Sequence, residues 1–213
     1  MEQIPGPTKE RLLYLMRLLE QAAGQGAITS AQIEALTGWA SHTVRKDISL
    51  LGAAISGEGD TGAVGSSAGY APEALIPLIK KALDLEKRRK FCVVGLGRLG
   101  SAYLNAPVLP DSEFELAAGF DTNVNRTEIL ASSVPLYPAY KMGEVISRFG
   151  IEIALLCVPV EAAQSAADKL AAAGIRGILN FAPVLISVSP GIAVQNVYLD
   201  DELRALSIKI KGD

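Results

Sequence analysis

Apolar residues in the first fifty positions recur at helical spacing between short polar turns. The first stripe follows the i, i+3, i+4, i+7 rule of one helix face and consists of Leu12, Leu15, Met16 and Leu19. Gly24 and Gly26 end this helix. A second, short helix begins at the Thr29-Ser30 pair, and Ser41 caps a third helix over 42–50. The pattern therefore predicts three consecutive helices.

The hydrophobic pattern changes at residue 52. Six glycines stand at positions 52, 57, 59, 62, 65 and 69 among serine and threonine, which predicts a flexible loop or a loose hairpin. A further helix is predicted over 72–85, and it leads into the basic run 87–90, which we interpret as a solvated helix end. No lysine or arginine occurs between Ile48 and Ile79.

From residue 90 onward, apolar runs alternate with helical segments. The runs that predict strands lie at 91–94, 114–120, 134–137, 151–158, 177–181 and 192–197, and the helical segments lie within 95–105 and at 142–149, 161–173 and 200–210. Continuous apolar strands separated by helices predict a parallel sheet covered on both faces. We therefore expect an α/β protein in three parts, with boundaries at 1–86, 87–199 and 200–213.

Composition and charge narrow the class of protein. The chain has 213 residues, of which 49 % are apolar and 20 % charged, as in a globular protein with a sizeable core. No apolar run is long enough to cross a bilayer and the N-terminus lacks a signal-peptide pattern, so a cytoplasmic protein is expected. Cys92 and Cys157 lie in strand-like runs and are predicted to be buried thiols, with no metal site.

The charges show no broad basic surface. Residues 1–90 carry 11 Lys and Arg against 10 Asp and Glu, and residues 91–213 carry 9 against 13. Contact with nucleic acid would have to come from a local pattern.

A glycine motif at 95–100 carries the clearest chemistry. Gly95-Leu-Gly-Arg-Leu-Gly100 follows a buried strand and opens a helix, and Asp121 ends the next strand 21 residues later, which is the context of a dinucleotide-binding fingerprint. Gly95 permits the tight turn, Gly97 lets the backbone approach the pyrophosphate, and Gly100 lets the helix lie close to the strand. The predicted cofactor loop comprises Gly95, Leu96, Gly97, Arg98, Leu99 and Gly100. A glycine turn without a ligand is the alternative.

Asp121 bears on the choice of dinucleotide. Its carboxylate is expected to accept hydrogen bonds from the adenine ribose hydroxyls, which favours NAD over NADP because a 2′-phosphate would meet a negative charge. Arg126 lies five residues further on and is available to a phosphate.

Nothing in the chain predicts catalysis. A dehydrogenase needs a group that moves a proton together with the hydride, and the single histidine, His42, lies outside the nucleotide-binding segment. Tyr137 and Lys141 have the spacing of a catalytic Tyr-x-x-x-Lys pair, but Pro138 between them predicts a strand end or turn rather than the helix that the pair requires. We therefore expect a protein that is not an enzyme.

The helices of the first part are typical of a winged helix-turn-helix. The third helix would then enter the major groove of DNA with its N-terminal end near base edges or phosphates. Side chains in this helix that are candidates for DNA contact are Ser41, His42, Thr43, Arg45 and Lys46. A small helical dimerisation or cap domain is the alternative.

Four stretches together resemble the Rex family of redox-sensing transcriptional repressors: 44–49, 94–100, 158–164 and 174–183. The resemblance implies an N-terminal winged helix domain that binds operator DNA and a C-terminal Rossmann domain that binds NAD(H). It also implies a homodimer in which the final helix, in 200–213, is exchanged between subunits. In such a repressor NADH binding releases the operator.

The resemblance also assigns residues beyond the glycine loop and Asp121. The nicotinamide side would be lined by Val158, Pro159, Asn180, Phe181 and Ala182. Arg17 stands where the family has an arginine that links the DNA-binding domain to the partner's nucleotide site, and Tyr198 and Leu199 belong to the same signal-coupling region. The chain departs from the family in having Tyr198 in place of an aspartate, Ala106 in place of a common tyrosine, and no basic pair in the wing at 64–70.

Three functions follow from these patterns. The first is an NADH/NAD⁺-responsive repressor that binds operator DNA as a homodimer. The second is a Rex-like nucleotide-binding paralogue with weakened or lost DNA binding, which the neutral wing suggests. The third is a small NAD-dependent oxidoreductase or a CoA-binding module.

Overall fold

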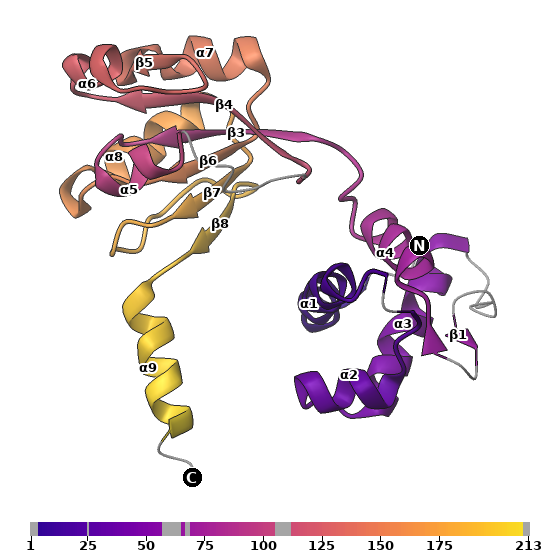
Figure 1. The fold of residues 1–213 in the computed structure, drawn as a ribbon. Coiled ribbons are helices and arrows are strands. Elements are labelled where there is room, and N and C mark those ends of the chain that lie inside the picture. Colours follow the sequence, from indigo (N-terminus) through magenta and orange to yellow (C-terminus); the bar gives the residue numbers. More distant parts are fainter. Residues whose placement is uncertain (1–3, 25, 57–64, 67–68, 105–111, 211–213) are drawn as a thin grey trace. The chain divides into compact units, whose positions relative to one another are not determined.

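The structure is a computed structural model that describes residues 4–24, 26–56, 65–66, 69–104 and 112–210. The chain divides into two compact units, Met1–Lys87 and Arg88–Asp213 (Figure 1).

The first unit consists of helices and one small hairpin. In chain order its elements are α1 (Gly6–Gln21), α2 (Ser30–Thr37), α3 (Ser41–Ser56), β1 (Gly65–Ser66), β2 (Gly69–Tyr70) and α4 (Pro72–Ala82). Leu12, Leu15 and Leu19 of α1 are buried in its core, as the apolar stripe predicts, and Met16 is only partly buried beside them. The buried residues that they meet come from the other elements: Ile28, Ile33, Val44, Ile48, Leu51, Leu75 and Ile79.

Two predicted boundaries in this unit were wrong. The third helix continues to Ser56 instead of ending near residue 50, and α4 ends at Ala82 instead of residue 85. The chain turns after α4 because Asp84 takes a left-handed conformation with φ of 54°.

The glycine-rich stretch contains a hairpin, which is one of the two alternatives that the sequence left open. β1 and β2 pair antiparallel, and Tyr70 of β2 also exchanges two backbone hydrogen bonds with Ile28, at 2.8 and 2.9 Å. The greater part of the stretch, 57–64 and 67–68, lies outside the described residues.

The second unit is built on a six-stranded parallel sheet, as predicted. Its elements are β3 (Arg89–Val94), α5 (Arg98–Ala102), β4 (Phe114–Asp121), α6 (Val124–Ile129), β5 (Leu136–Pro138), a 3₁₀-helix (Ala139–Lys141), α7 (Met142–Phe149), β6 (Ile153–Leu156), α8 (Val160–Ala172), β7 (Gly177–Asn180), β8 (Ala193–Asn196) and α9 (Leu199–Ile210). The strand order is β5-β4-β3-β6-β7-β8, which is the doubly wound order of a dinucleotide-binding domain. The direction of winding reverses between β3 and β6, so the carboxyl ends of these two strands flank the crevice where such sheets bind ligands.

Alternate residues of the strands face two different layers. Cys92, Val94 and Leu156 belong to the larger core, together with Ile146 of α7 and Leu170 of α8. Phe91, Val93 and Leu155 face the opposite side, where Leu96 and Leu104 at the two ends of α5 join them. This alternation follows from the two-residue period of a strand.

Helix α6 was not predicted. Its sequence, Val-Asn-Arg-Thr-Glu-Ile, has no apolar stripe, and none of its residues is buried. Asn123 begins the helix by accepting a hydrogen bond from the backbone N–H of Asn125 at 3.1 Å.

The two cysteines carry free thiols; Cys92 is buried as predicted, but Cys157 is partly exposed, contrary to the prediction. Among the residues that the structure describes, we find no helix long and apolar enough to cross a membrane. The same residues hold no cluster of three or more metal-ligating side chains.

Candidate functional site

The glycine loop between β3 and α5 gives its three glycines different surroundings. Gly95 has φ of +91°, and a Cβ there would lie 2.5 Å from the carbonyl oxygen of Cys157. A Cβ on Gly100 would lie 1.9 Å from the carbonyl oxygen of Gly95. Apart from its chain neighbours, no heavy atom of the described residues lies within 4 Å of a Cβ built on Gly97. Gly95 and Gly100 are therefore required by the packing of the loop, whereas Gly97 faces space that a ligand can enter.

The remaining loop residues divide between the core and the surface. Leu96 is buried, while Arg98 and Leu99 are exposed at the start of α5. The first turn of a helix leaves backbone N–H groups without helical partners, and these groups favour anions such as a pyrophosphate.

Asp121 lies next to this loop at the end of β4. Its side chain is 4 % exposed, and one carboxylate oxygen, Oδ2, accepts a hydrogen bond from the backbone N–H of Leu96 at 2.8 Å. The other oxygen, Oδ1, accepts from the backbone N–H of Asn123 at 2.7 Å. Arg126 places a guanidinium nitrogen 3.3 Å from Oδ2. The carboxylate thus joins β4 to the glycine loop and is paired with a cation.

The ends of β6 and β7 supply the other predicted cofactor residues. Val158 follows β6 and lies against the glycine loop, since a Cβ on Gly95 would be 2.8 Å from a Val158 methyl group. Pro159 precedes the first residue of α8. Asn180 ends β7, and Phe181 follows it with its ring centroid 5.8 Å from that of Tyr103.

Asn180 is fully buried and holds a cluster of polar groups. Its amide nitrogen donates to the carbonyl of Val184 at 2.8 Å and to the side-chain oxygen of Asn196 at 2.9 Å, and its oxygen accepts from the backbone N–H of Ala182. The Tyr198 hydroxyl lies 3.2 Å from the same amide nitrogen and donates to the Val184 carbonyl at 2.8 Å. The cluster fixes the turn that follows β7.

Tyr198 also holds the start of α9. Its carbonyl accepts hydrogen bonds from the backbone N–H groups of Asp201 and Glu202, at 3.1 and 3.2 Å. Tyr198 therefore connects the first turn of α9 to the turn after β7. The sequence singled out Tyr198 by its departure from the family, but nothing in the sequence indicated that Val184 and Asn196 would be its partners.

Neither the tyrosine–lysine pair that was weighed for catalysis nor the Cys157 thiol is placed as a reactive group. Tyr137 lies in β5 with its ring centroid 6.0 Å from that of Phe120, and Lys141 ends the following 3₁₀-helix, so the predicted strand end and turn are confirmed. Burial raises the pKa of Cys157 to about 12, which keeps its thiol neutral.

Helix α3 presents one charged face and one buried face. His42, Arg45 and Lys46 are exposed, while Val44 and Ile48 are buried in the core. Thr43 is partly exposed between them. The spacing of the exposed side chains follows the helical repeat, which places them on one side of the helix.

Ser41 does not cap α3, because the helix begins at Ser41 and the carbonyl of Ala40 accepts its first hydrogen bonds. Glu34 of α2 serves this end of the helix instead. Its carboxylate accepts hydrogen bonds from the Ser41 hydroxyl and, at 3.1 Å, from the Ser41 backbone N–H. These two bonds, together with the nearby His42 and Arg45, lower the pKa of Glu34. Sequence reasoning missed Glu34 because the contact joins two helices.

A buried carboxylate fixes α3 on α1. Asp47 is 4 % exposed, and Arg11 donates to both of its oxygens, at 2.6 and 2.8 Å. The hydroxyl of Thr8 donates to the same carboxylate at 3.1 Å. The hydrogen bond from Arg11 to Asp47 raises the pKa of Arg11. This cluster orients α3 and was also missed by sequence reasoning.

The predicted coupling residues lie in different units, and one position that departs from the family lies outside the described residues. Arg17 is exposed on α1, and Tyr198 and Leu199 stand at the start of α9. Ala106 lies outside the described residues.

A helix-turn-helix unit joined to a dinucleotide-binding sheet defines a class of protein, the ligand-responsive transcriptional regulators. Residues 86–184 match the family model described as CoA binding domain, and residues 3–49 match the model described as putative DNA-binding protein N-terminus. The chain is 38 % identical to the redox-sensing transcriptional repressor Rex of Thermus thermophilus over 98 % of its own length and 94 % of that protein.

Two solved structures show the same fold over the whole chain at 27 % identity. One is RSP, a Rex-family repressor, in complex with β-NAD⁺ and operator DNA, with a TM-score of 0.85 and coverage of 94 % of that chain. The other is RSP in complex with β-NADH, with a TM-score of 0.83 and coverage of 96 %. The chain belongs to the Rex family of redox-sensing transcriptional repressors. The resemblance and the α/β fold predicted from the sequence are confirmed, and the chain is a regulator rather than an enzyme.

Proposed function

We propose that this protein is an NADH/NAD⁺-responsive repressor that binds operator DNA as a homodimer and is released by NADH. The observation that carries the proposal is the open space at Gly97, in the loop that Asp121 holds by a hydrogen bond. The same chain exposes His42, Arg45 and Lys46 on α3. The ligands of the related RSP structures support it.

The residues of the second unit fit a dinucleotide. The pyrophosphate would lie over Gly97 at the start of α5, and the adenosine would lie near Asp121. The nicotinamide would lie toward the ends of β6 and β7, where the candidate residues are Val158, Pro159, Asn180, Phe181 and Ala182. NADH and NAD⁺ differ by one hydride and by the positive charge of the oxidised ring, and that difference is the signal that the protein reads.

The exposed face of α3 would contact the DNA. Arg45 and Lys46 would contact phosphates or a guanine, and His42 and Thr43 would lie near base edges at the N-terminal end of the helix. The Ser41 hydroxyl is already bound to Glu34, so its contribution is to hold the helix end rather than to reach the DNA.

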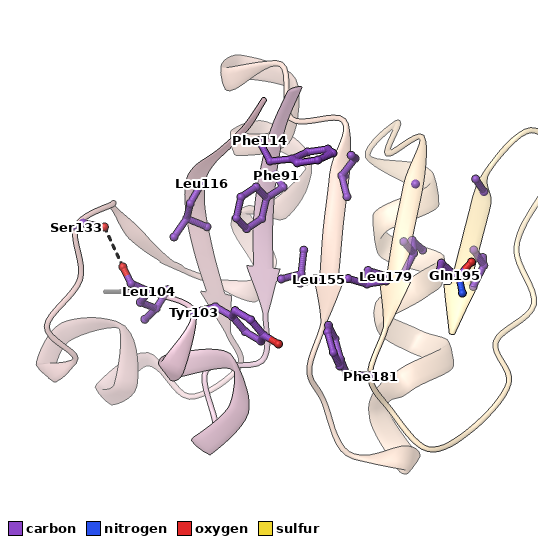
Figure 2. Close-up of a pocket in the computed structure, with 15 residues that line it drawn as sticks. Phe91, Tyr103, Leu104, Phe114, Leu116, Ser133, Leu155, Leu179, Phe181 and Gln195 are labelled. Carbon is purple, nitrogen blue, oxygen red and sulfur yellow. Dashed lines mark hydrogen bonds between the residues drawn. The ribbon is translucent and has the colours of Figure 1, made fainter. Parts of the chain in front are cut away.

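Two apolar surfaces of the second unit that no described residue covers support a dimer. Every residue of α9 is exposed, including Leu199, Leu203 and Leu206. The sheet face that carries Phe91, Leu116, Leu155, Leu179 and Phe181 forms a hollow of about 700 Å³ (Figure 2). Apolar surface of this extent marks an interaction site. We infer that α9 packs against a second copy of the chain.

Operator binding in the presence of each nucleotide tests the proposal. Labelled palindromic operator is titrated with the full-length protein at ~50 mM salt, where phosphate contacts contribute strongly. We expect NADH to weaken operator binding and NAD⁺ to leave it unchanged, and we expect Arg45→Ala to bind operator poorly in every condition. No operator binding with either nucleotide would contradict the proposal.

The second candidate, a paralogue that binds nucleotide but has weakened DNA binding, is favoured by the absence of Lys and Arg between Ile48 and Ile79. Wings that enter the minor groove usually carry Arg or Lys, because the groove is electronegative. Operator binding that is lost in Arg45→Ala would exclude a paralogue that has lost its affinity for DNA. Tight binding of CoA without binding of NADH would instead favour a CoA-binding module.

A further inference from the structure

The adenosine end of the proposed nucleotide site differs from that of a site selective for NAD. In such a site an acidic residue presents its carboxylate to the ribose hydroxyls and repels a 2′-phosphate. Here the Asp121 carboxylate is 4 % exposed and both of its oxygens accept backbone hydrogen bonds, from Leu96 at 2.8 Å and from Asn123 at 2.7 Å. Asp121 therefore acts chiefly as a link between β4 and the glycine loop.

The negative charge of Asp121 is already balanced. Arg126 donates from one guanidinium nitrogen to Oδ2 at 3.3 Å, which is a long hydrogen bond, and the Arg126 side chain is 49 % exposed. A guanidinium has five N–H donors, and among the described residues the Asp121 carboxylate is the single side-chain partner of Arg126. At the adenosine end of the site, the exposed charge is therefore the Arg126 guanidinium rather than the Asp121 carboxylate.

The neighbouring side chains are uncharged or basic. Between Asp121 and Arg126 the chain carries Thr122, Asn123, Val124 and Asn125, and no acid lies in the first turn of α6. The next acid is Glu128, two positions beyond Arg126, which places it on a different side of α6. On the glycine loop that Asp121 holds, Arg98 is exposed.

We propose that Arg126 is a specificity-determining residue whose guanidinium binds a 2′-phosphate, so that the site takes NADP(H) in addition to NAD(H). Arginine is suited to this because its planar donors bind phosphate oxygens in pairs. The expectation from the sequence that Asp121 disfavours NADP assumed a free carboxylate, and the structure shows a buried and paired one. The inference rests on the proposed function, because it concerns the same nucleotide site.

Calorimetric titration of the full-length protein with NADH and with NADPH tests this assignment. Three variants are compared with the unchanged chain: Arg126→Gln, Arg126→Lys and Arg176→Gln. Arg176 is the matched control, since it loses the same charge from a side chain that is 70 % exposed and paired with Glu152 at 3.1 Å, next to the amino end of β7. Circular dichroism checks that each variant is folded.

We expect Arg126→Gln to raise the Kd for NADPH by about ten-fold or more and to change the Kd for NADH by less than about three-fold. The Kd of Arg126→Lys for NADPH should lie between those of the unchanged chain and Arg126→Gln, because lysine keeps the charge but loses the paired donors. Arg176→Gln should change neither Kd. The fragment 2′,5′-ADP should show the same dependence on Arg126 as NADPH, because it carries the 2′-phosphate without the nicotinamide.

Three results would overturn the assignment. NADPH that fails to bind a protein that binds NADH contradicts it and leaves the proposed function intact. An equal loss of both nucleotides in Arg126→Gln contradicts it in the same way. If neither nucleotide binds the unchanged chain, the proposed function fails and the inference fails with it.

Discussion

Gly97 and Gly100 stand three residues apart in one loop, but side chains at the two positions would meet different surroundings. Apart from its chain neighbours, a Cβ at position 97 meets no heavy atom of the described residues within 4 Å, whereas a Cβ at position 100 would lie 1.9 Å from a backbone carbonyl oxygen. The backbone of Gly97, with φ of −70° and ψ of −162°, is also open to other residues. The two substitutions therefore separate ligand binding from folding.

We expect Gly97→Val to keep its unfolding temperature and to weaken NADH binding by about ten-fold or more, because the side chain fills the space where the pyrophosphate would lie. Gly100→Ala should lower the free energy of unfolding by about 3 kcal/mol or more. Thermal unfolding and NADH titration of both variants measure the difference. NADH binding that is unchanged in Gly97→Val would place the nucleotide elsewhere.

Glu34 places a negative charge beside the face of α3 that is proposed to contact DNA. Glu34→Gln keeps an oxygen that accepts hydrogen bonds from Ser41 but removes the charge, and DNA phosphates are repelled by a carboxylate. We expect this variant to bind operator about two- to five-fold more tightly, with an unfolding temperature close to that of the unchanged chain. Fluorescence anisotropy with labelled operator measures the affinity. Weaker binding by a stable Glu34→Gln would show that the carboxylate itself contributes to operator recognition.

Helix α3 depends on α1 through the cluster of Asp47, Arg11 and Thr8. Asp47→Ala leaves the Arg11 guanidinium and the buried Thr8 hydroxyl without their acceptor. We expect the free energy of unfolding to fall by about 2–3 kcal/mol and operator affinity to fall because α3 loses its orientation.

Arg45→Ala is the control for that prediction, since Arg45 is exposed on the same helix. It should weaken operator binding while changing the free energy of unfolding by less than about 0.5 kcal/mol. Denaturant unfolding followed by operator titration distinguishes the two variants. A fully stable Asp47→Ala would show that the ion pair does not hold the helix.

The base of α9 is fixed to the turn after β7 by the Tyr198 hydroxyl, next to the proposed nicotinamide pocket. In Tyr198→Phe the bonds from Asn180 to Val184 and Asn196 remain, so the cost in stability should be about 1 kcal/mol. We expect NADH affinity to stay within about three-fold while the effect of NADH on operator binding shrinks, because the link to α9 is lost. Operator titration with and without NADH measures this effect. An unchanged NADH effect would exclude Tyr198 from signal coupling.

At the scale of elements, the sequence predicted what depends on repeating local patterns. The apolar runs at 91–94, 114–120 and 177–181 mark β3, β4 and β7, because strands buried on both faces carry no polar alternation. Helix α6 escaped prediction because it buries nothing. The Glu34–Ser41, Asp47–Arg11 and Asp121–Leu96 contacts also escaped, since each joins residues that come together only after the chain has folded.

At the scale of the whole molecule, the protein combines a near-neutral DNA-binding unit with an acidic nucleotide-binding unit. Each phosphate that a protein contacts adds about one unit to the slope of log affinity against log salt concentration. The first unit has basic side chains on α3 but none between Ile48 and Ile79. We therefore predict that the salt dependence of operator affinity comes from α3 rather than from the wing. In the proposed dimer, operator recognition would then depend on holding two α3 helices at the spacing of two half-sites.

Release by NADH requires that the nucleotide bind the DNA-free form more tightly than the DNA-bound form. A hundred-fold weakening of operator binding corresponds to a coupling free energy of about 2.7 kcal/mol. The two ligands must affect each other by the same factor, because the coupling is reciprocal.

The central claim is this coupling, and the affinity for NADH in the presence and absence of operator measures it most directly. The fluorescence of NADH is titrated with the free protein and with protein saturated with operator. We predict that operator raises the Kd for NADH by the factor by which NADH raises the Kd for operator, on the order of ten- to a hundred-fold. A Kd for NADH that is the same with and without bound operator would contradict the account.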